Sequence, residues 1–317
     1  MKVAAIDVGT NTALLLVAAV DDHGVITPIL DEQRIPRLGK GVDARGVLQP
    51  DSIRRALDVL EEYLRLLAPH EPEALILAAT SAVRDAANKD EFREIVHSRT
   101  GLDLEVLDGE AEALWTYRGA RSGIPGDGLM TVVDIGGGST EITIGDGEAI
   151  RKSMSLDLGS VRLTERFFRN DPPLPREIDE ARSFVREALG GCRTFTAPEL
   201  IGVAGTAAAL ALLDQGLRDF RWEAVSDYRL GIERIDSLLR QIQTMPSSQI
   251  RNLNTFLEGR EDIIIAGTLI LAELLTACGF RDVVVSDRGV RYGLVLREWE
   301  RRAKTRSVPG RDFGRPL

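Results

Sequence analysis

Residues 132–141 read VVDIGGGSTE, in which an apolar strand runs into an acidic, glycine-rich turn. Near the start of the chain, residues 4–12 read AAIDVGTNT and follow the same order. Each turn is followed by a second apolar run, over residues 14–20 and 142–145, and then by a polar turn with glycine and a third strand-like run. A unit that occurs twice in this way predicts two related domains that face each other.

Both turns have the chemistry of a site for a metal-bound phosphate. Glycine lets the backbone approach a ligand closely, and consecutive backbone N–H groups in such a turn form a concave anion site. The carboxylates of Asp7 and Asp134 would repel phosphate, but they suit a divalent cation that bridges protein and phosphate oxygens. Asp-Gly and Gly-Gly also occur in ordinary turns. Two matching copies between apolar strands favour the functional interpretation.

The composition is that of a globular protein with a net negative charge. The 317 residues are enough for two domains, and 44% of them are hydrophobic. A net charge of −9 argues against a general electrostatic grip on nucleic acid or an anionic membrane. An anionic substrate would therefore need a local group of arginines.

Cysteine usage and hydropathy together indicate which cellular compartment to expect for this protein. Cys192 and Cys278 have no metal-ligand spacing and favour a reducing environment. The apolar start of the chain is too short for a secretory signal before Asp7 interrupts it, and no apolar run is long enough to span a bilayer. A soluble cytoplasmic protein is expected.

Strands mixed with helices predict the α/β class, and the two antiparallel meanders argue against a doubly wound fold of parallel strands alone. The Gly- and Pro-rich loop 121–128 precedes the second copy of the repeat. We therefore expect an N-terminal domain over residues 1–125 and a C-terminal domain over 126–300, with the last helix free to pack back on the first domain. Residues 301–317 are mostly basic, and we expect a poorly ordered tail there.

The elements follow from periodicity and capping residues. Residues 2–36 are expected to form three strands with a turn at 21–24, and Gly119 is expected to stop the helix that Asp108 caps. The last helix is expected to end near Trp299. Further helices are predicted near residues 50–67, 90–99, 108–118, 159–168, 175–190, 231–243 and 262–278, and buried strands near 74–79, 104–107, 200–204 and 282–286.

Two glutamates lie in the first turn of the helix that follows Asp108. The helix dipole favours the ionised form of Glu110 and Glu112, and their spacing lets only one of them face a cleft. An ionised, oriented glutamate could deprotonate water, an effect worth about 10²–10⁴ in rate. The alternative is that acidic residues simply favour helix N-termini.

Other positions carry weaker signals. Arg84, at the end of a buried strand, could clamp a phosphate or form a salt bridge, for example to Glu91. Gly205-Thr206 and residues 287–289 resemble junctions that any α/β protein contains. The only histidines, His23, His70 and His97, form no ligand pair, which excludes histidine–aspartate phosphohydrolase chemistry. No nucleophile elbow, Walker loop or dinucleotide fingerprint occurs.

These residues together resemble the exopolyphosphatase / guanosine pentaphosphate phosphatase (Ppx/GppA) family of the actin-like superfamily. The resemblance runs from Asp7 to about Arg297 and is strongest in residues 132–141 and in Gly-Glu-Ala-Glu-Ala at 109–113. It implies an α/β fold of two actin-like (ribonuclease H-like) domains with mixed sheets that flank a central cleft. The supporting pieces are residues 7–11, 80–84, 156–162, 205–206 and 288–289.

The resemblance also implies roles for individual residues. Glu112 aligns with the catalytic base, and Asp7, Asp134 and Glu141 align with acidic positions that hold or orient Mg²⁺, for which Mn²⁺ is a substitute. The implied phosphate-binding residues are Gly9, Thr10, Asn11, Arg84, Gly136, Gly137, Gly138, Ser139, Gly205 and Thr206. A monovalent cation and a homodimer are further expectations from the family.

The implied reaction is hydrolysis of the terminal phosphoanhydride of inorganic polyphosphate, or of guanosine pentaphosphate to the tetraphosphate. Leu114 stands where the family often has an arginine, and longer relatives carry an added C-terminal helical region. Both departures favour short polyphosphates or a nucleotide as substrate. Two alternatives are a small-molecule kinase on the same scaffold and a non-catalytic sensor of guanosine tetra- or pentaphosphate. A cysteine-rich zinc motif, as in some sugar kinases of this fold, is excluded by the two isolated cysteines.

Overall fold

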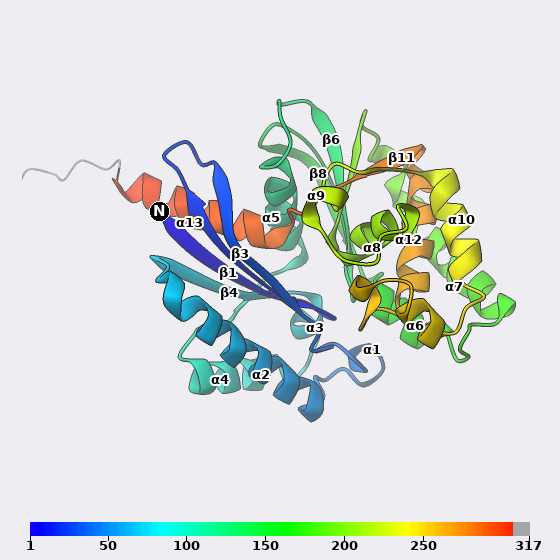
Figure 1. The fold of residues 1–317 in the computed structure, drawn as a ribbon, viewed down its shortest axis with the longest axis horizontal. Coiled ribbons are helices and arrows are strands. Elements are labelled where there is room, and N and C mark those ends of the chain that lie inside the picture. Colours follow the sequence, from blue (N-terminus) through cyan, green and yellow to red (C-terminus); the bar gives the residue numbers. More distant parts are fainter. Residues whose placement is uncertain (307–317) are drawn as a thin grey trace, which may run out of the picture.

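Each half of the chain folds around its own mixed β-sheet (Figure 1). The computed structural model describes residues 1–306. The first sheet has the order β3-β2-β1-β4-β5 and the second the order β10-β11-β9-β6-β7-β8. The strands of the first sheet are β1 (Lys2–Val8), β2 (Ala13–Val20), β3 (Ile26–Arg34), β4 (Ala74–Ala79) and β5 (Glu105–Val106). Those of the second are β6 (Leu129–Ile135), β7 (Thr140–Asp146), β8 (Ala149–Leu156), β9 (Leu200–Val203), β10 (Arg229–Gly231) and β11 (Asp282–Val285).

The repeat that the sequence predicts is present in the strand pairing. β1 pairs antiparallel with β2 and parallel with β4, and β6 pairs antiparallel with β7 and parallel with β9. Asp7 and Asp134 occupy equivalent places, one residue before the last residue of β1 and β6. The predicted α/β class with two mixed sheets is confirmed.

Helices cover both sheets. The first lobe, by which we mean the first sheet and the helices on it, contains α1 (Val42–Arg45), α2 (Pro50–Leu67), η1 (Ala68–His70), α3 (Ser81–Arg84), α4 (Lys89–Thr100) and α13 (Val290–Arg306). The helix α5 (Gly109–Arg121) packs between α13 and the second sheet. The second lobe contains α6 (Ser160–Phe167), α7 (Pro175–Ala188), η2 (Leu189–Thr194), α8 (Ala204–Asp214), α9 (Trp222–Val225), α10 (Ile232–Ile242), α11 (Ser247–Arg251), η3 (Thr255–Leu257) and α12 (Ile264–Cys278).

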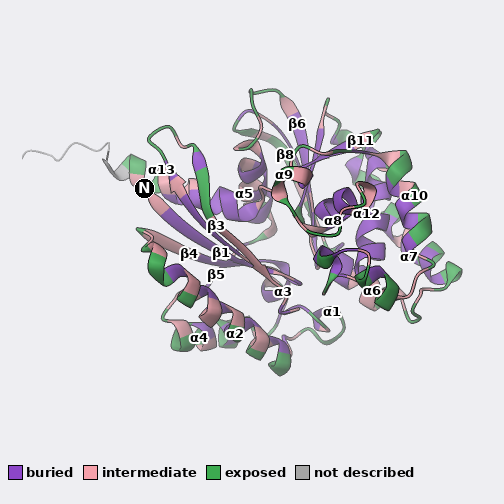
Figure 2. Cartoon of the chain, in the orientation of Figure 1, coloured by how far each residue is buried: buried purple, intermediate pink, exposed green. Residues whose placement is uncertain are grey.

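The core of the second lobe is built around α12. Almost every residue of α12 is buried, so this mainly apolar helix is covered on all sides instead of on one face (Figure 2). In the first lobe, α2 buries Leu57, Leu60 and Tyr63 against the sheet, and the Tyr63 hydroxyl donates to the carbonyl of Ala13 at 2.7 Å. Within residues 1–306, no helix combines the length and hydropathy needed to cross a bilayer.

The helices α5 and α13 cross at backbone contact beside the first sheet. A Cβ on Gly119 would overlap the carbonyl oxygen of Gly289, and a Cβ on Gly293 would overlap that of Trp115. The prediction that Gly119 ends α5 is therefore wrong: the helix runs to Arg121, and the missing side chain serves the packing of α13. α13 packs on β1 and continues to Arg306, past its expected end near Trp299. The rest of the expected tail, residues 307–317, lies outside the described residues.

Candidate active site

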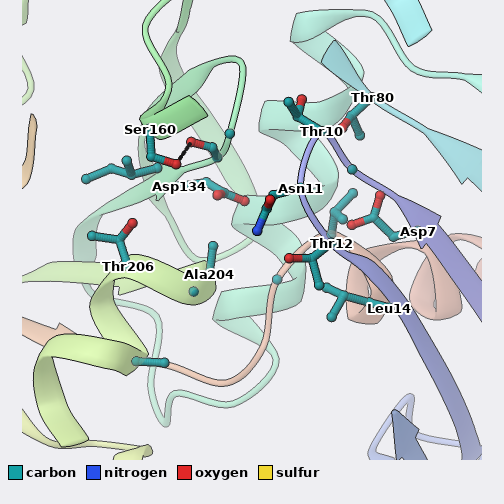
Figure 3. Close-up of a pocket in the computed structure, with 18 of the residues that line it drawn as sticks. Asp7, Thr10, Asn11, Thr12, Leu14, Thr80, Asp134, Ser160, Ala204 and Thr206 are labelled. Atoms are coloured by element: carbon teal, nitrogen blue, oxygen red, sulfur yellow. Dashed lines mark hydrogen bonds between the residues drawn. The ribbon is translucent and has the colours of Figure 1, made fainter. Parts of the chain in front are cut away.

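The two acidic glycine turns line one pocket between the lobes (Figure 3). The pocket has a cavity of about 150 Å³. Asp7 enters it from the first lobe and Asp134 from the second, so both carboxylates open onto the same space. The predicted site residues that line the pocket are Asp7, Gly9, Thr10, Asn11, Glu112, Asp134, Gly136, Gly137, Gly138, Ser139, Gly205 and Thr206. The predicted residues Arg84 and Glu141 do not line it.

Small residues allow the two turns to touch. A Cβ on Gly137 would lie 2.9 Å from the Cβ of Thr10, and one on Gly138 would lie 2.9 Å from the Thr10 hydroxyl and would overlap the hydroxyl of Ser81. Glycine is therefore required here by the close approach of the lobes. The same approach places both turns within reach of one small ligand.

The N-terminus of α6 fixes the second turn from behind. The backbone N–H groups of Ser160 and Val161 donate to the carbonyls of Gly136 and Gly137 at 2.9 and 2.8 Å. The side chain of Arg162 donates from Nε to the carbonyl of Gly138 at 2.8 Å. These bonds engage the turn's carbonyl oxygens, which would otherwise repel an anion, and they hold the turn in one conformation.

The acidic residues around the pocket repel one another. Burial, together with the charges of Glu112 and Asp134, raises the pKa of Asp7 to about 8. Burial and the charge of Glu112 raise the pKa of Asp134 to about 7. The pKa of Glu141 also rises well above its usual value through burial and the same neighbours. Shifts of this kind are typical of functional sites, where buried carboxylates are held close together.

Glu112 is the glutamate that faces the pocket. It is buried and lines the cavity, whereas Glu110 on the same helical turn is exposed, so the prediction that only one of the two faces a cleft is confirmed. Asp108 caps the helix by accepting from the N–H of Ala111 at 2.8 Å. Burial raises the pKa of Glu112, and the hydrogen bond and charge of Arg84 oppose that rise.

Arg84 reaches Glu112 from α3. Its Nη1 donates to Glu112 Oε2 at 2.7 Å and to the carbonyl of Leu107 at 3.2 Å. The salt bridge considered from the sequence exists, but its partner is Glu112 and not Glu91. The expected phosphate contact of Arg84 stays a prediction.

The donor set can hold a divalent cation with several waters. Asp7 Oδ1 and Glu141 Oε2 are buried and have no hydrogen-bond partner. Glu141 Oε1 accepts from the Ser155 hydroxyl at 2.7 Å, which turns this side chain toward β8. Within residues 1–306, no three acidic, histidine or cysteine side chains are grouped closely enough to hold a metal by themselves. Mg²⁺ commonly uses only one or two carboxylates and keeps its waters, so Asp7 and Asp134 fit this ion.

The sequence analysis missed part of the pocket lining. Arg260 lies there, 6% exposed, with Nη2 donating to Gln33 Oε1 at 2.9 Å and its guanidinium 4.1 Å from the centre of the Phe256 ring. Burial lowers the pKa of Arg260 to about 10, and no carboxylate among residues 1–306 pairs with it. Trp222 also lines the pocket. The one available signal was an arginine shortly before a mainly apolar helix.

The turn after β9 is strained. Ala204 has φ 68°, in the left-handed region that residues other than glycine seldom adopt, and it lines the pocket together with Gly205 and Thr206 (Figure 3). A Cβ on Gly205 would lie 3.0 Å from Nε of Arg260. Strain of this kind often marks a ligand site, because the surrounding fold must hold the residue there.

The sequence model of the Ppx/GppA phosphatase family matches residues 16–302. The chain belongs to this family. Exopolyphosphatase 2 of Mycobacterium tuberculosis is 36% identical over 312 residues, which cover 93% of this chain and 98% of that protein. The crystal structure of the Aquifex aeolicus member of the Ppx/GppA family has a TM-score of 0.81 at 32% identity and covers 95% of this chain and 98% of its own.

A relative of lower sequence identity is named for a different enzymatic activity. A guanosine-5'-triphosphate,3'-diphosphate pyrophosphatase of Vibrio campbellii is 30% identical over 97% of this chain, which spans 63% of that protein. Membership of the Ppx/GppA phosphatase family makes the chain a hydrolase of phosphoanhydrides and favours a divalent-metal requirement.

Proposed function

We propose that this Ppx/GppA protein is an exopolyphosphatase, which removes the terminal phosphate of inorganic polyphosphate as orthophosphate. The observation that carries the proposal is the position of Glu112, buried in the wall of the pocket that the two glycine turns line. Phosphoryl transfer depends mainly on positioning and charge, and it needs no covalent nucleophile. The pocket can supply positioning and charge, although its lining contains no histidine or cysteine.

Glu112 is the proposed base. As a carboxylate it orients a water molecule and accepts its proton as the water attacks the terminal phosphorus. Arg84 holds one carboxylate oxygen, and the hydroxyl of Thr80 also bonds this side chain, so its direction is fixed before substrate binds. A general base fixed in this way contributes about 10²–10⁴ in rate.

The terminal phosphoryl group is proposed to lie between the two turns. The backbone of Gly136–Ser139 on one side and of Gly9–Asn11 on the other surrounds it, and Thr206 closes the third side. Asp7 and Asp134 are the proposed ligands of Mg²⁺, with Glu141 behind them. The cation, when bound, neutralises charge on the phosphate oxygens.

Arg260 is proposed to contact a phosphate further along the substrate. A buried guanidinium without a carboxylate partner is costly, and an anionic ligand offsets that cost. The absence of an arginine at Leu114 removes a contact expected for long chains. We therefore propose short polyphosphates as the preferred substrates.

The aromatic residues of the pocket favour a nucleotide as a second candidate substrate. Trp222 and Phe256 give the pocket an aromatic wall, which a purine base could stack on and which linear polyphosphate does not need. Guanosine pentaphosphate is therefore the alternative, with hydrolysis of its terminal 5'-phosphate. A sensor that only binds this nucleotide would not need Glu112 in the pocket.

The substrates can be separated by one assay. Purified protein with Mg²⁺ is given polyphosphates of graded length, guanosine pentaphosphate, or ATP with sugars, at matched concentration, and orthophosphate and phosphorylated sugar are measured. Orthophosphate release from short polyphosphate at the highest kcat/KM supports the proposal. Preference for the nucleotide supports the alternative, and phosphorylated sugar would show a kinase. A homodimer and a cytoplasmic location stay predictions.

A further inference from the structure

Arg162 of α6 connects the two lobes beside the pocket without lining it. Its guanidinium donates from Nε to the carbonyl of Gly138 at 2.8 Å, in the second lobe. Its two remaining nitrogens reach the first lobe, where Nη1 donates to Asp43 Oδ1 at 2.7 Å and Nη2 donates to Asp85 Oδ2 at 2.6 Å. The side chain is 15% exposed. One planar group thus spans three partners in a fixed geometry.

On the second lobe, Arg162 completes the support of the glycine turn. Backbone N–H groups at the start of α6 hold the carbonyls of Gly136 and Gly137, and the Arg162 side chain holds that of Gly138. A Cβ on Gly159 would overlap the backbone of Gly137 and lie 2.5 Å from the carbonyl carbon of Gly138, so α6 and the turn are already at backbone contact. The orientation of the last peptide of the turn therefore depends on Arg162.

On the first lobe, Arg162 bonds Asp85, which lies next to Arg84, the partner of the proposed base Glu112. Asp85 Oδ1 lies 3.7 Å from Nε of Arg84, and Arg84 in turn donates to Glu112. Asp85 therefore lies beside the Arg84 guanidinium, at a different nitrogen from the one that donates to Glu112. Because Arg162 also donates to Asp85 at 2.6 Å, it fixes the carboxylate that lies beside Arg84.

We propose that Arg162 is a positioning residue for phosphoanhydride hydrolysis, which sets both the peptide at Gly138 and the Arg84–Glu112 pair. The inference rests on the proposed function and extends it to a residue outside the pocket. A lysine cannot replace this arginine, because one ammonium group cannot match three acceptors with the planar fork of a guanidinium. A displacement of about 1 Å at the reacting groups can cost about 10²-fold in rate.

Arg166 provides a matched control on the same helix. It donates to Asp43 at 2.9 Å and is exposed, but within residues 1–306 it has no bond to Gly138 or Asp85. Arg166→Ala therefore removes a bridge between the lobes and leaves the turn and Arg84 as they are. Asp43 keeps Arg162 as its partner in that variant.

The test compares Arg162→Ala, Arg162→Lys and Arg166→Ala in the full chain. We expect both Arg162 variants to lower kcat by about 10- to 100-fold and to change KM by less than about 3-fold. Arg166→Ala should stay within about 2-fold of wild type in both constants. Unchanged kcat in the Arg162 variants, or an equal loss in Arg166→Ala, would overturn the proposal.

Hydrogen exchange gives a second readout that needs no substrate. The backbone N–H groups of residues 136–139 should exchange faster in both Arg162 variants than in Arg166→Ala, because the Gly138 peptide has lost its anchor. Equal exchange in all variants would contradict the role of Arg162 even if activity fell. If wild type hydrolyses no phosphoanhydride, the proposed function fails and the exchange result still decides the structural role.

Discussion

Nη1 of Arg84 donates to Oε2 of Glu112 at 2.7 Å, and this pair connects the end of α3 to the start of α5 beside the pocket. Both side chains are largely withdrawn from solvent, with 20% and 9% of their side-chain surfaces exposed. The hydrogen bond and charge of Arg84 oppose the rise in the Glu112 pKa that burial causes. The proposed reaction requires Glu112 as a carboxylate, which this pairing favours.

The first prediction concerns the pH dependence of hydrolysis in Arg84→Met. Burial raises the pKa of Glu112 and Arg84 lowers it, so loss of the guanidinium raises this pKa further. Because Glu112 acts as a carboxylate, the acidic limb of kcat against pH should move to higher pH. Stability should also fall, since breaking a largely buried pair costs about 3 kcal/mol or more. An acidic limb at the wild-type pH would contradict the pairing.

The second prediction concerns stability without metal. The folded chain holds Asp7 and Asp134 at pKa values of about 8 and 7, above the usual 3.8, so folding is accompanied by proton uptake at neutral pH. The stabilisation that protonation gives is present at low pH and is lost as pH rises through these values. We expect Tm in EDTA to fall between pH 6 and pH 8, and Mg²⁺ to raise Tm more at pH 8.

Asp134→Asn tests the same electrostatics. This change removes one of the repelling charges, so the metal-free Tm at pH 8 should rise while hydrolysis is lost. A variant less stable than wild type at pH 8 in EDTA would show that Asp134 is not a source of repulsion. Exposed Asp103→Asn is the control, and its Tm should match that of wild type.

The third prediction tests the crossing of α5 and α13. In Gly293→Ala, the new Cβ would overlap the carbonyl oxygen of Trp115, so the helices must separate. We expect a loss of about 1–3 kcal/mol in the free energy of unfolding, measured by denaturant titration. Gly190→Ala is the control, because nothing lies within 4 Å of its Cβ position. Equal stability of the two variants would contradict backbone contact at the crossing.

The fourth prediction concerns Arg260. Arg260→Met keeps much of the side-chain volume and removes a buried charge that has no carboxylate partner, so stability without substrate should be unchanged or higher. KM for polyphosphate should rise by about 10-fold or more, the value of one charge-assisted contact. A variant with wild-type KM would place Arg260 outside the substrate path.

The fold and most of the pocket could be predicted from the sequence because local patterns encode them. The Asp-x-Gly turns at the ends of apolar strands place Asp7 and Asp134, and the helix cap at Asp108 places Glu112. Each of these features depends on residues close in the chain. The two copies of the repeat then predicted that the two turns face each other across one site.

Features that depend on distant residues escaped the prediction. Gly119 has the usual sequence of a helix stop, and only α13, about 170 residues later, makes it part of a helix crossing. The sequence did not identify Glu112 as the salt-bridge partner of Arg84, because tertiary packing brings the two side chains together. Arg260 lines the pocket because the segment before α12 packs there, and the local sequence does not specify that packing.

The central claim is that Glu112 activates the water that attacks the terminal phosphate, and the most direct measurement is orthophosphate release from short polyphosphate by Glu112→Gln, with Glu110→Gln as the control. The account predicts that Glu112→Gln loses about 10²-fold or more in kcat while it binds polyphosphate with nearly unchanged affinity, and that Glu110→Gln behaves as wild type. Release at the wild-type rate by Glu112→Gln, or equal losses in both variants, would contradict it.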